Sequence, residues 1–317
     1  ISLDTSSNNT IYANNIFGVV NVYAVTLIDY SMNNVISGNY IENNCSGIFI
    51  SNSSGQISEN TLKNNEIHIT DSIDVQIIGN DISSKYNGST GIYLSNTIAE
   101  VHYNRITGFT YGIRVTNNST VDTTNNWWGS NTVSYINSTT TPISSYDIWN
   151  NNSSLTYDPW LVLNVDSSTV NSSGKTSVTG DLTHNSDGDD TSTDGYVPNG
   201  IPINFTTNFG TITGTAYTVK GRSTTILDLG TRQTQNVNVS ALIDDQTISA
   251  QSVIATGMAT VNITSTAINN STGQPVNLTY SLPLDSTVTW VSELWRNTYV
   301  FYGEMDLIVI GRAVETI

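Results

Sequence analysis

The amino-acid sequence has few charged residues, few basic ones in particular, and few of the residues that favour helices. Lys and Arg number 10 and Asp and Glu 26 among 317 residues, so the formal net charge is −16. A surface of that sign repels a phosphate backbone, which excludes nucleic acid as a partner. Asn, Ser, Thr, Ile, Val and Tyr dominate over Lys, Glu, Leu and Ala, and this balance predicts strands and turns almost everywhere.

Disulfides and membrane spans are also missing. Cys45 is the single cysteine, so no intrachain disulfide can form, and we expect it to be buried as a small apolar side chain. The longest apolar stretch, residues 16–28, is interrupted by Asn21 and Thr26 and is too short to cross a bilayer. The sequence begins at Ile1 without a signal sequence, so we expect its targeting and anchoring parts to have been removed.

A six-residue phrase, apolar-x-x-Asn-x-apolar, recurs through the first third of the chain. Its Asn residues lie 20 to 25 residues apart, at Asn14, Asn39, Asn60, Asn80 and Asn104. A second phrase, small-apolar-x-apolar, alternates with it at residues 24–27, 47–50, 91–94 and 112–115, and residues 66–69 fill its fifth place. Two staggered short strands per repeat, with a third between them, predict five coils of a parallel β-helix over residues 1–130.

The geometry of such a coil explains the choice of residues. Alternate Ile, Val and Leu side chains would point inward and stack on their counterparts about 4.8 Å away in the next coil. Asn tolerates the left-handed bend between strands, and stacked Asn amides bond along the axis, so the Asn row is predicted to be structural.

The sixth recurrence of the phrase has Thr124 in place of Asn and continues into Trp127 and Trp128. We expect these two side chains to close the open end of the helix as a hydrophobic lid, because a solenoid needs a cap. A platform on which sugar rings stack is the alternative.

Residues 131–161 are predicted to be a cap and linker, with an aromatic island at residues 146–149 and a final Asp158-Pro159-Trp160-Leu161. An Asn-rich β-helix that ends in Asn-Trp-Trp-Gly at 126–129 and continues through this Asp-Pro-Trp-Leu resembles the adhesin-like, surface-layer-type proteins of methanogenic archaea. The resemblance covers residues 1 to about 165. It implies an all-β, right-handed, pectin-lyase-like parallel β-helix on an extracellular cell-surface protein.

The second half changes to longer alternating strands, which predict a β-sandwich over residues 162–256. Residues 197–212 are similar to the invasin/intimin-type bacterial Ig-like domain, and this similarity implies a stalk or spacer. Gly200 and Gly210 would then lie in turns, and Ile203 and Phe205 in the core. A second small β-sandwich is predicted for residues 257–317, and its apolar last strand, residues 305–310, could pair with a neighbouring subunit.

One loop of the second half is acidic and contains Asp187, Asp189, Asp190 and Asp194 beside Asn185. Oxygen ligands at alternate positions favour calcium, which is the possible cofactor. No Glu follows at the position that an EF-hand requires, so a solvated turn is the competing interpretation.

Catalysis has to be considered because many parallel β-helices are polysaccharide lyases or hydrolases, which need converging carboxylates near an Arg or Lys. The acids and bases of residues 1–130 do not fall at one phase of the repeat. Asp81 and Arg105 take the same position in adjacent coils, which predicts a surface ion pair, and Arg114 is expected to point outward. We therefore assign no catalytic residue and predict that the chain is not an enzyme. The histidines fall in different coils or domains and predict no shared zinc site: His68, His102 and His184.

The sequence contains many Asn-x-Ser/Thr sequons, which favour a glycosylated, secreted protein. The glycosylation candidates are Asn8, Asn52, Asn87, Asn118, Asn137, Asn152, Asn171, Asn204, Asn238, Asn262, Asn270 and Asn277. We predict a non-catalytic cell-surface protein that attaches to glycans or to other cell-surface proteins. A structural subunit of a surface layer or extracellular filament, in which the chain forms a homo-polymer, is the alternative. A polysaccharide lyase or hydrolase is disfavoured.

Overall fold

The computed structural model describes residues 1–17, 22–42, 46–167, 174–230, 236–254, 258–268 and 275–283. Side chains are described up to residue 249, apart from those of 86–88 and 236. The described residues form strands, turns and bends, and no helix among them is long and apolar enough to span a membrane. Cys45 lies outside the described residues, as do residues 284–317 with the predicted apolar last strand.

The N-terminal part is a solenoid built from an 11-stranded sheet with two faces and a 7-stranded sheet, all paired in parallel. The long face of the first sheet contains β1 (Ser2–Asp4), β4 (Val25–Ile28), β7 (Ile48–Ser51), β10 (Ile67–Thr70), β12 (Asp81–Ser95), β14 (Arg105–Thr116), β17 (Tyr146–Asn150) and β16 (Tyr135–Asn137). Its short face contains β3 (Asn15–Phe17), β6 (Tyr40–Glu42), β9 (Thr61–Lys63) and the first residues of β12 and β14. The second sheet contains β2 (Thr10–Tyr12), β5 (Asn34–Ser37), β8 (Gly55–Ser58), β11 (Val75–Ile78), β13 (Ile98–His102), β15 (Thr120–Asp122) and β18 (Ser154–Thr156).

The predicted fold class is confirmed: the chain is all-β and opens with a right-handed parallel β-helix of about five turns. Aliphatic side chains stack from coil to coil in register, as in the row Ile48, Ile67, Ile92 and Ile113 on the long face. Each of these four side chains is fully buried. Because a one-residue slip would turn every one of them outward, this row fixes the register of the coils.

The Asn row is a buried hydrogen-bonded ladder. Asn39 donates through its backbone N–H and through Nδ2 to Oδ1 of Asn60, both at 2.9 Å, and Nδ2 also reaches the carbonyl oxygen of Ile11 at 2.9 Å. The row continues into the sixth coil although Thr124 replaces Asn in the phrase there, because Asn126 accepts from Asn104 at 3.0 Å. The spacing of the sequence phrase therefore changes in this coil, but the hydrogen-bonded row of Asn side chains continues.

The ladder Asn residues do not have the left-handed backbone conformation. This corrects the expectation that Asn occurs in the row because it tolerates a left-handed bend. The left-handed conformation belongs to the residue before, as in Gly38 with φ 65°, Gly79 with φ 66° and Glu59 with φ 56°. Asn does take this conformation at other bends, for example Asn52 and Asn96. The ladder position thus selects Asn for its amide group, and the tolerance for left-handed bends matters one residue earlier.

A second ladder, of hydroxyl groups, lies between the long face and the second sheet. The backbone N–H of Ser31 donates to Oγ of Ser53 at 3.1 Å, and that of Ser53 donates to Oγ of Ser72 at 3.3 Å. Thr97 and Ser119 repeat the contact at 3.1 Å. These side chains are buried, so their hydroxyl oxygens accept hydrogen bonds from backbone N–H groups that cannot bond to water.

Strand pairing continues past residue 130, into the stretch expected to be a cap and linker. The aromatic island forms β17, which pairs in parallel with β14, and β18 pairs with β15. Trp128 is buried in the solenoid core, but Trp127 is buried in the core of the next domain. The two-Trp lid is therefore corrected to one Trp on each side of a domain junction, and burial of both rings removes the sugar-platform alternative.

The next domain is a sandwich of two four-stranded antiparallel sheets that share one core. One sheet contains β19 (Leu161–Ser167), β20 (Lys175–Asn185), β24 (Arg222–Asp228) and β22 (Thr211–Ile212), and the other contains β23 (Thr215–Tyr217), β21 (Pro202–Thr207), β25 (Asn236–Ile243) and β26 (Gln246–Ile254). Ile203 and Phe205 are buried in the core, and Gly200 and Gly210 adopt left-handed turns, as expected. The Ig-like assignment stays a prediction. Beyond it, β27 (Met258–Ile268) and β28 (Pro275–Pro283) form an antiparallel hairpin.

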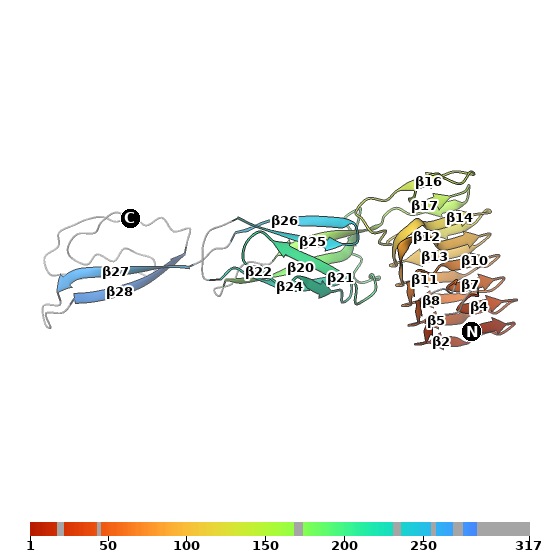
Figure 1. The fold of residues 1–317 in the computed structure, drawn as a ribbon, viewed down its shortest axis with the longest axis horizontal. Helices are drawn as coiled ribbons and strands as arrows, with labels where there is room; N and C mark the ends of the chain where they lie inside the picture. Colours follow the sequence, from red (N-terminus) through yellow and green to blue (C-terminus); the bar gives the residue numbers. More distant parts are fainter. Residues whose placement is uncertain are drawn as a thin grey trace.

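The sandwich joins the side of the solenoid. In Figure 1 the coils are stacked across the long axis of the molecule, and the sandwich extends away from them along that axis. The backbone N–H of Trp127 and the carbonyl of Asn104 bond at 2.9 Å, so Trp127 stands at the end of the short face. The short face is consequently the one that the sandwich meets, while the outer side of the long face is left for other contacts.

Candidate functional site

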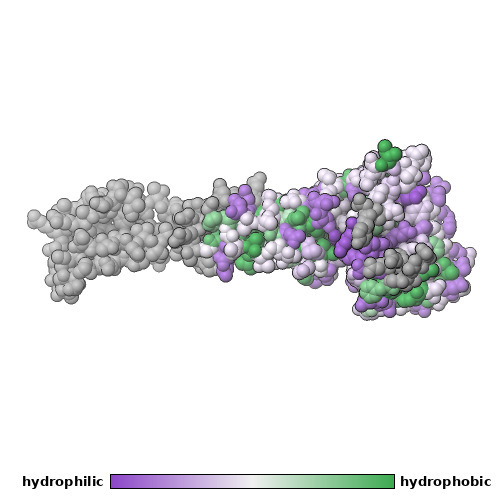
Figure 2. Space-filling view, viewed as in Figure 1, coloured by the Kyte–Doolittle hydropathy of each residue, from purple (hydrophilic) through white to green (hydrophobic). Residues whose placement is uncertain are grey.

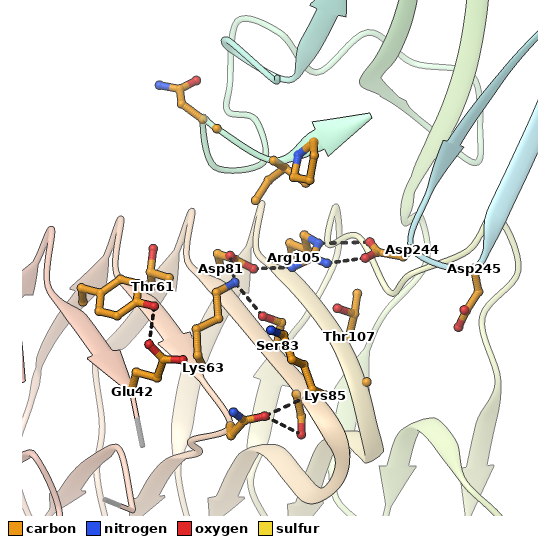
Figure 3. A pocket seen from close by; sticks show the side chains of 18 residues that line it. Glu42, Thr61, Lys63, Asp81, Ser83, Lys85, Arg105, Thr107, Asp244 and Asp245 are labelled. Carbon is orange, nitrogen blue, oxygen red and sulfur yellow. Dashed lines mark hydrogen bonds and ion pairs between the residues drawn. The ribbon is translucent and has the colours of Figure 1, made fainter. Parts of the chain in front are cut away.

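A polar cleft of about 630 Å³ lies where the short face of the solenoid meets the sandwich. The short strands have a buried apolar residue at their centre, so the residues on either side of it point outward into the cleft. In this way Glu42, Lys63, Asp81 and Arg105 come from four successive coils, and Asp244 comes from the turn after β25 (Figure 3). Hydrophilic residues gather at this junction in Figure 2.

Four charged groups of the cleft form one network, whereas Lys85 and Asp245, which also line the cleft, are in none of the ion pairs between described residues. Arg105 donates from Nη1 to Oδ1 of Asp81 at 2.6 Å and from Nε to Oδ2 of Asp244 at 3.1 Å. Lys63 contacts the other oxygen of Asp81, and Trp127 donates from Nε1 to Asp244 at 2.7 Å. Burial acts to lower the pKa of Arg105, but Asp81 and Asp244 outweigh it and raise that pKa above its ordinary value.

This network corrects the expectation of a surface ion pair. The Asp81–Arg105 pair exists, but side-chain exposure is only 8% for Asp81 and 14% for Arg105, and Asp244 is a third member. Glu42 also has a partner, since it accepts a hydrogen bond from the Tyr40 hydroxyl at 2.6 Å and thereby raises the pKa of that hydroxyl. The network is thus suited to hold the two domains together, because its two acids, Asp81 and Asp244, are neutralised by its two bases, Lys63 and Arg105.

The outer side of the long face has a different character, with an aromatic row that runs from coil to coil. Register pairs Phe49 with His68, His68 with Tyr93, and Tyr93 with Arg114. Ring centroids are 5.5 Å apart for Phe49 and His68 and 4.6 Å for His68 and Tyr93, and Tyr23 stacks on Phe49 at 4.8 Å. Phe49, His68 and Tyr93 are half-buried, so each ring presents part of its surface.

A row of hydroxyl groups runs beside the aromatic row. Ser51, Thr70, Ser95 and Thr116 are in register with one another, two residues further along each strand. Two residues of a strand span roughly 6.6 Å, so the two rows are parallel and close. Ser51 and Thr70 are half-buried, whereas Ser95 and Thr116 are buried. The half-buried rings beside the Ser51 and Thr70 hydroxyl groups, which can donate and accept hydrogen bonds, match the surface of a sugar, which has both apolar and polar groups. Figure 1 places the strands of both rows side by side across the solenoid.

Arg114 points outward between buried Ile113 and Val115, as predicted, and extends the aromatic row. Its guanidinium carbon lies 4.1 Å from the centroid of Trp149 and 5.1 Å from that of Tyr93. Trp149 is buried and donates from Nε1 to the carbonyl oxygen of Ser138 at 2.9 Å.

The glycosylation candidates are distributed over both domains. Six have exposed side chains: Asn8, Asn118, Asn137, Asn152, Asn204 and Asn238. Asn52 is half-buried. The other five have no described side chain: Asn87, Asn171, Asn262, Asn270 and Asn277. An exposed side chain is what a glycosyltransferase needs, so the first six remain the stronger candidates.

The four Asp of the predicted calcium loop are exposed. The loop is organised by Asn185, whose Oδ1 accepts from the backbone N–H of Asp187 at 3.2 Å and of Asp189 at 3.0 Å. Hydrogen bonds from Ser192 lower the pKa of Asp190. Within the described ranges, no three His, Cys, Asp or Glu side chains are grouped so that they could hold a metal ion. The calcium assignment stays a prediction.

The three His residues lie apart. His68 belongs to the aromatic row, where Nδ1 is 3.2 Å from the Tyr23 hydroxyl. His102 contacts the carbonyl oxygen of Thr124 at 2.9 Å on the second sheet, and His184 lies 3.7 Å from Asp181 in the sandwich.

Two features of these sites were missed at the sequence level. The aromatic row had a visible signal, because the variable position of the second phrase holds Phe49, His68 and Tyr93 in successive coils. Asp244 had none: it is separated from Arg105 by 139 residues, and an Asp-Asp pair after an apolar strand is typical of any polar turn.

Comparison with known proteins gives one family. A family model described as periplasmic copper-binding protein (NosD) matches residues 1–160. No curated protein matches the chain.

Proposed function

The chain belongs to the NosD family of periplasmic copper-binding proteins, and on that premise we propose that it is a non-catalytic protein of the cell envelope that attaches to glycans through its solenoid. The family places the chain in an extracellular or envelope compartment. Display at the cell surface is part of the proposal, and so is adhesion.

The observation that carries this proposal is the paired aromatic and hydroxyl rows on the outer side of the long face. The aromatic row repeats in every coil from β7 to β12, and half-buried Ser51 and Thr70 accompany it in the first two of these coils. A chain of sugar units has a repeat of its own and can lie along such a surface. Aromatic rings contribute about 0.5–1.5 kcal/mol each beyond their buried area, which suits a weak, additive attachment.

The sandwich is proposed to be a stalk. It meets the solenoid through the buried Asp81–Arg105–Asp244 network and Trp127, on the side away from the two rows. Carboxylates that are already paired with cations are poor general acids or bases at neutral pH, which supports attachment without cleavage.

The copper that the family description names does not fit the described side chains of this chain. Copper is bound by imidazole, thiolate and thioether groups. His68, His102 and His184 are separate, and the part of the chain that the structure describes contains no group of three His, Cys, Asp or Glu ligands. We therefore derive no step of the proposed function through a metal.

A glycan array probed with the purified chain tests the proposal. We expect bound glycans, and we expect Phe49→Ala and Tyr93→Ala each to weaken binding about tenfold, because each removes one stacking ring. Tyr12→Ala is the matched control, since Tyr12 is an aromatic residue with 64% exposure on the second sheet. Its binding should equal that of the unaltered chain.

Two outcomes would contradict the proposal. An array without bound glycans, together with ordered assemblies in electron micrographs, would favour the surface-layer or filament subunit. Release of unsaturated or reducing-end products from uronate polymers would establish a lyase or hydrolase.

A further inference from the structure

Arg114 is a cation held in place by aromatic rings. Tyr93 lies one coil before it and Trp149 one coil after it in register, so the guanidinium group is stacked between two rings. Such cation–π contacts fix the orientation of the guanidinium plane. Its Nε is buried and has no hydrogen-bond partner. At least one N–H group of Arg114 therefore has no acceptor among the described residues.

Arg114 also lacks a counter-charge in a strongly acidic protein. Arg105 is paired with Asp81 and Asp244, and Arg222 with Asp181. None of the ion pairs between described residues includes Arg114. In a protein with 26 acidic residues and a net charge of −16, Arg114 is the one described Arg without an ion pair.

We propose that Arg114 binds the acidic group of a glycan that lies along the long face, an inference that rests on the proposed attachment function. A guanidinium group is planar and matches the two oxygens of a carboxylate or sulfate, which accept from its N–H groups. The neighbouring half-buried Tyr93 ring would contact the sugar unit that carries this group. The ligand is thus an anionic saccharide, with a carboxylate or a sulfate as the charged group.

The net charge of the protein limits how acidic the glycan can be. A surface of −16 repels a polyanion over a Debye length of about 8 Å at physiological salt. A polymer with an acid on every unit would gain one contact at Arg114 and meet repulsion elsewhere. A mostly neutral glycan with isolated acidic units avoids that repulsion, and this is the class of ligand that we infer.

Calorimetric titration with two matched probes tests the inference. One probe is a xylo-oligosaccharide that carries a single glucuronate, and the other is the same oligosaccharide without it; a singly sulfated analogue forms a third arm. We expect the full chain to bind the acidic probes about 10- to 100-fold more tightly than the neutral one, as for a hydrogen bond to a charged group. A preference for carboxylate or sulfate then identifies the acid.

Variants separate the role of Arg114 from general electrostatics. Arg114→Gln should reduce the affinity for the acidic probe to that for the neutral probe, and Arg114→Lys should restore only part of it, since Lys lacks the planar fork. Lys220→Gln removes one exposed positive charge from the sandwich and should change nothing.

The outcomes also separate this inference from the proposed function. Equal binding of acidic and neutral probes by the unaltered chain would overturn the role of Arg114 and leave glycan attachment intact, without any need for a folded variant. Equal losses with Arg114→Gln and Lys220→Gln would overturn it too. No binding of any glycan on the array would refute attachment itself.

Discussion

One backbone position in every coil adopts a left-handed conformation, and it lies directly before the ladder Asn. Its φ angle is between 55° and 66° at Ala13, Gly38, Glu59, Gly79, Tyr103 and Asn125. A side chain with a Cβ atom meets steric repulsion there, which costs roughly 1–2 kcal/mol, and glycine does not. Two coils have glycine at this position, so the other coils carry strain that the neighbouring ladder has to offset.

Glu59→Gly should stabilise the solenoid. Glu59 is exposed and lies between coils that have Gly38 and Gly79 at the same position. We expect the free energy of unfolding in urea to rise by about 1 kcal/mol, with an unchanged slope against urea concentration.

Gly79→Ala is the reverse control for Glu59→Gly. A Cβ atom at Gly79 would meet nothing within 4 Å, so only the backbone conformation can oppose it. It should lower the free energy of unfolding by about 1 kcal/mol. If both variants change stability in the same direction, the left-handed backbone is not the cause.

At this scale the sequence predicted which side chains point inward, because strict alternation around the repeated Ile residues determines it. It did not predict the position of the strain. Ala13, Glu59 and Tyr103 give no sign of a left-handed backbone, and the Asn that directly follows each of them is the residue that would normally be suspected.

At the scale of elements, the short strands of the solenoid depend on the two ladders between them. A three-residue strand such as β6 or β9 makes few backbone hydrogen bonds of its own. Asn60 connects adjacent coils by accepting from Asn39 and donating from Nδ2 to Oδ1 of Asn80 at 3.0 Å and to the carbonyl oxygen of Ile36 at 2.8 Å. Each ladder member therefore serves the coils on both sides, and a member at the end of the row serves only one.

Asn80→Ala should destabilise the solenoid much more than Asn14→Ala. Asn80 is fully buried, and its loss removes the acceptor of the Asn60 backbone N–H and of one Nδ2 hydrogen bond, and a donor to the carbonyl oxygen of Ile57. We expect a loss of about 3–5 kcal/mol for Asn80→Ala, since each buried group left unpaired costs ~1–3 kcal/mol.

Asn14 is the matched control, because it has the same place in its phrase but is half-buried at the end of the ladder. Asn14→Ala should cost about 1 kcal/mol. Thermal unfolding followed by circular dichroism measures both. Equal losses would mean that the Asn side chains act independently and that the ladder adds nothing.

The sequence predicted the Asn ladder because Asn recurs with apolar residues at fixed offsets on both sides. The hydroxyl ladder escaped notice for a statistical reason: Ser and Thr are abundant throughout, so Ser31, Ser53 and Thr97 do not stand out at any spacing. The change of spacing that brings Asn126 into the row follows from an altered turn, and a pattern search that requires the old spacing passes over it.

At the scale of the whole molecule, the attachment face and the stalk are related through the junction. The sandwich occupies the short face, so the long face with its two rows remains accessible, and the orientation of this face depends on how firmly the domains are joined. Trp127 is buried in the sandwich core although it follows the solenoid ladder directly. No sequence pattern linked Arg105 to Asp244, because packing between the two domains determines which residues meet at their junction.

Asp244→Ala should uncouple the two domains. The substitution leaves buried Arg105 with Asp81 as its remaining carboxylate partner, and it removes the acceptor of Trp127 Nε1. Removing one partner of a buried ion pair costs about 3–5 kcal/mol of stability. Differential scanning calorimetry should then show the sandwich unfolding apart from the solenoid, where the unaltered chain unfolds them together. Asp228→Ala removes an exposed partner of Lys175 and should leave the calorimetric profile unchanged. A single transition in Asp244→Ala, shifted to lower temperature without splitting, would mean that Asp244 stabilises only the sandwich and that the network does not join the domains.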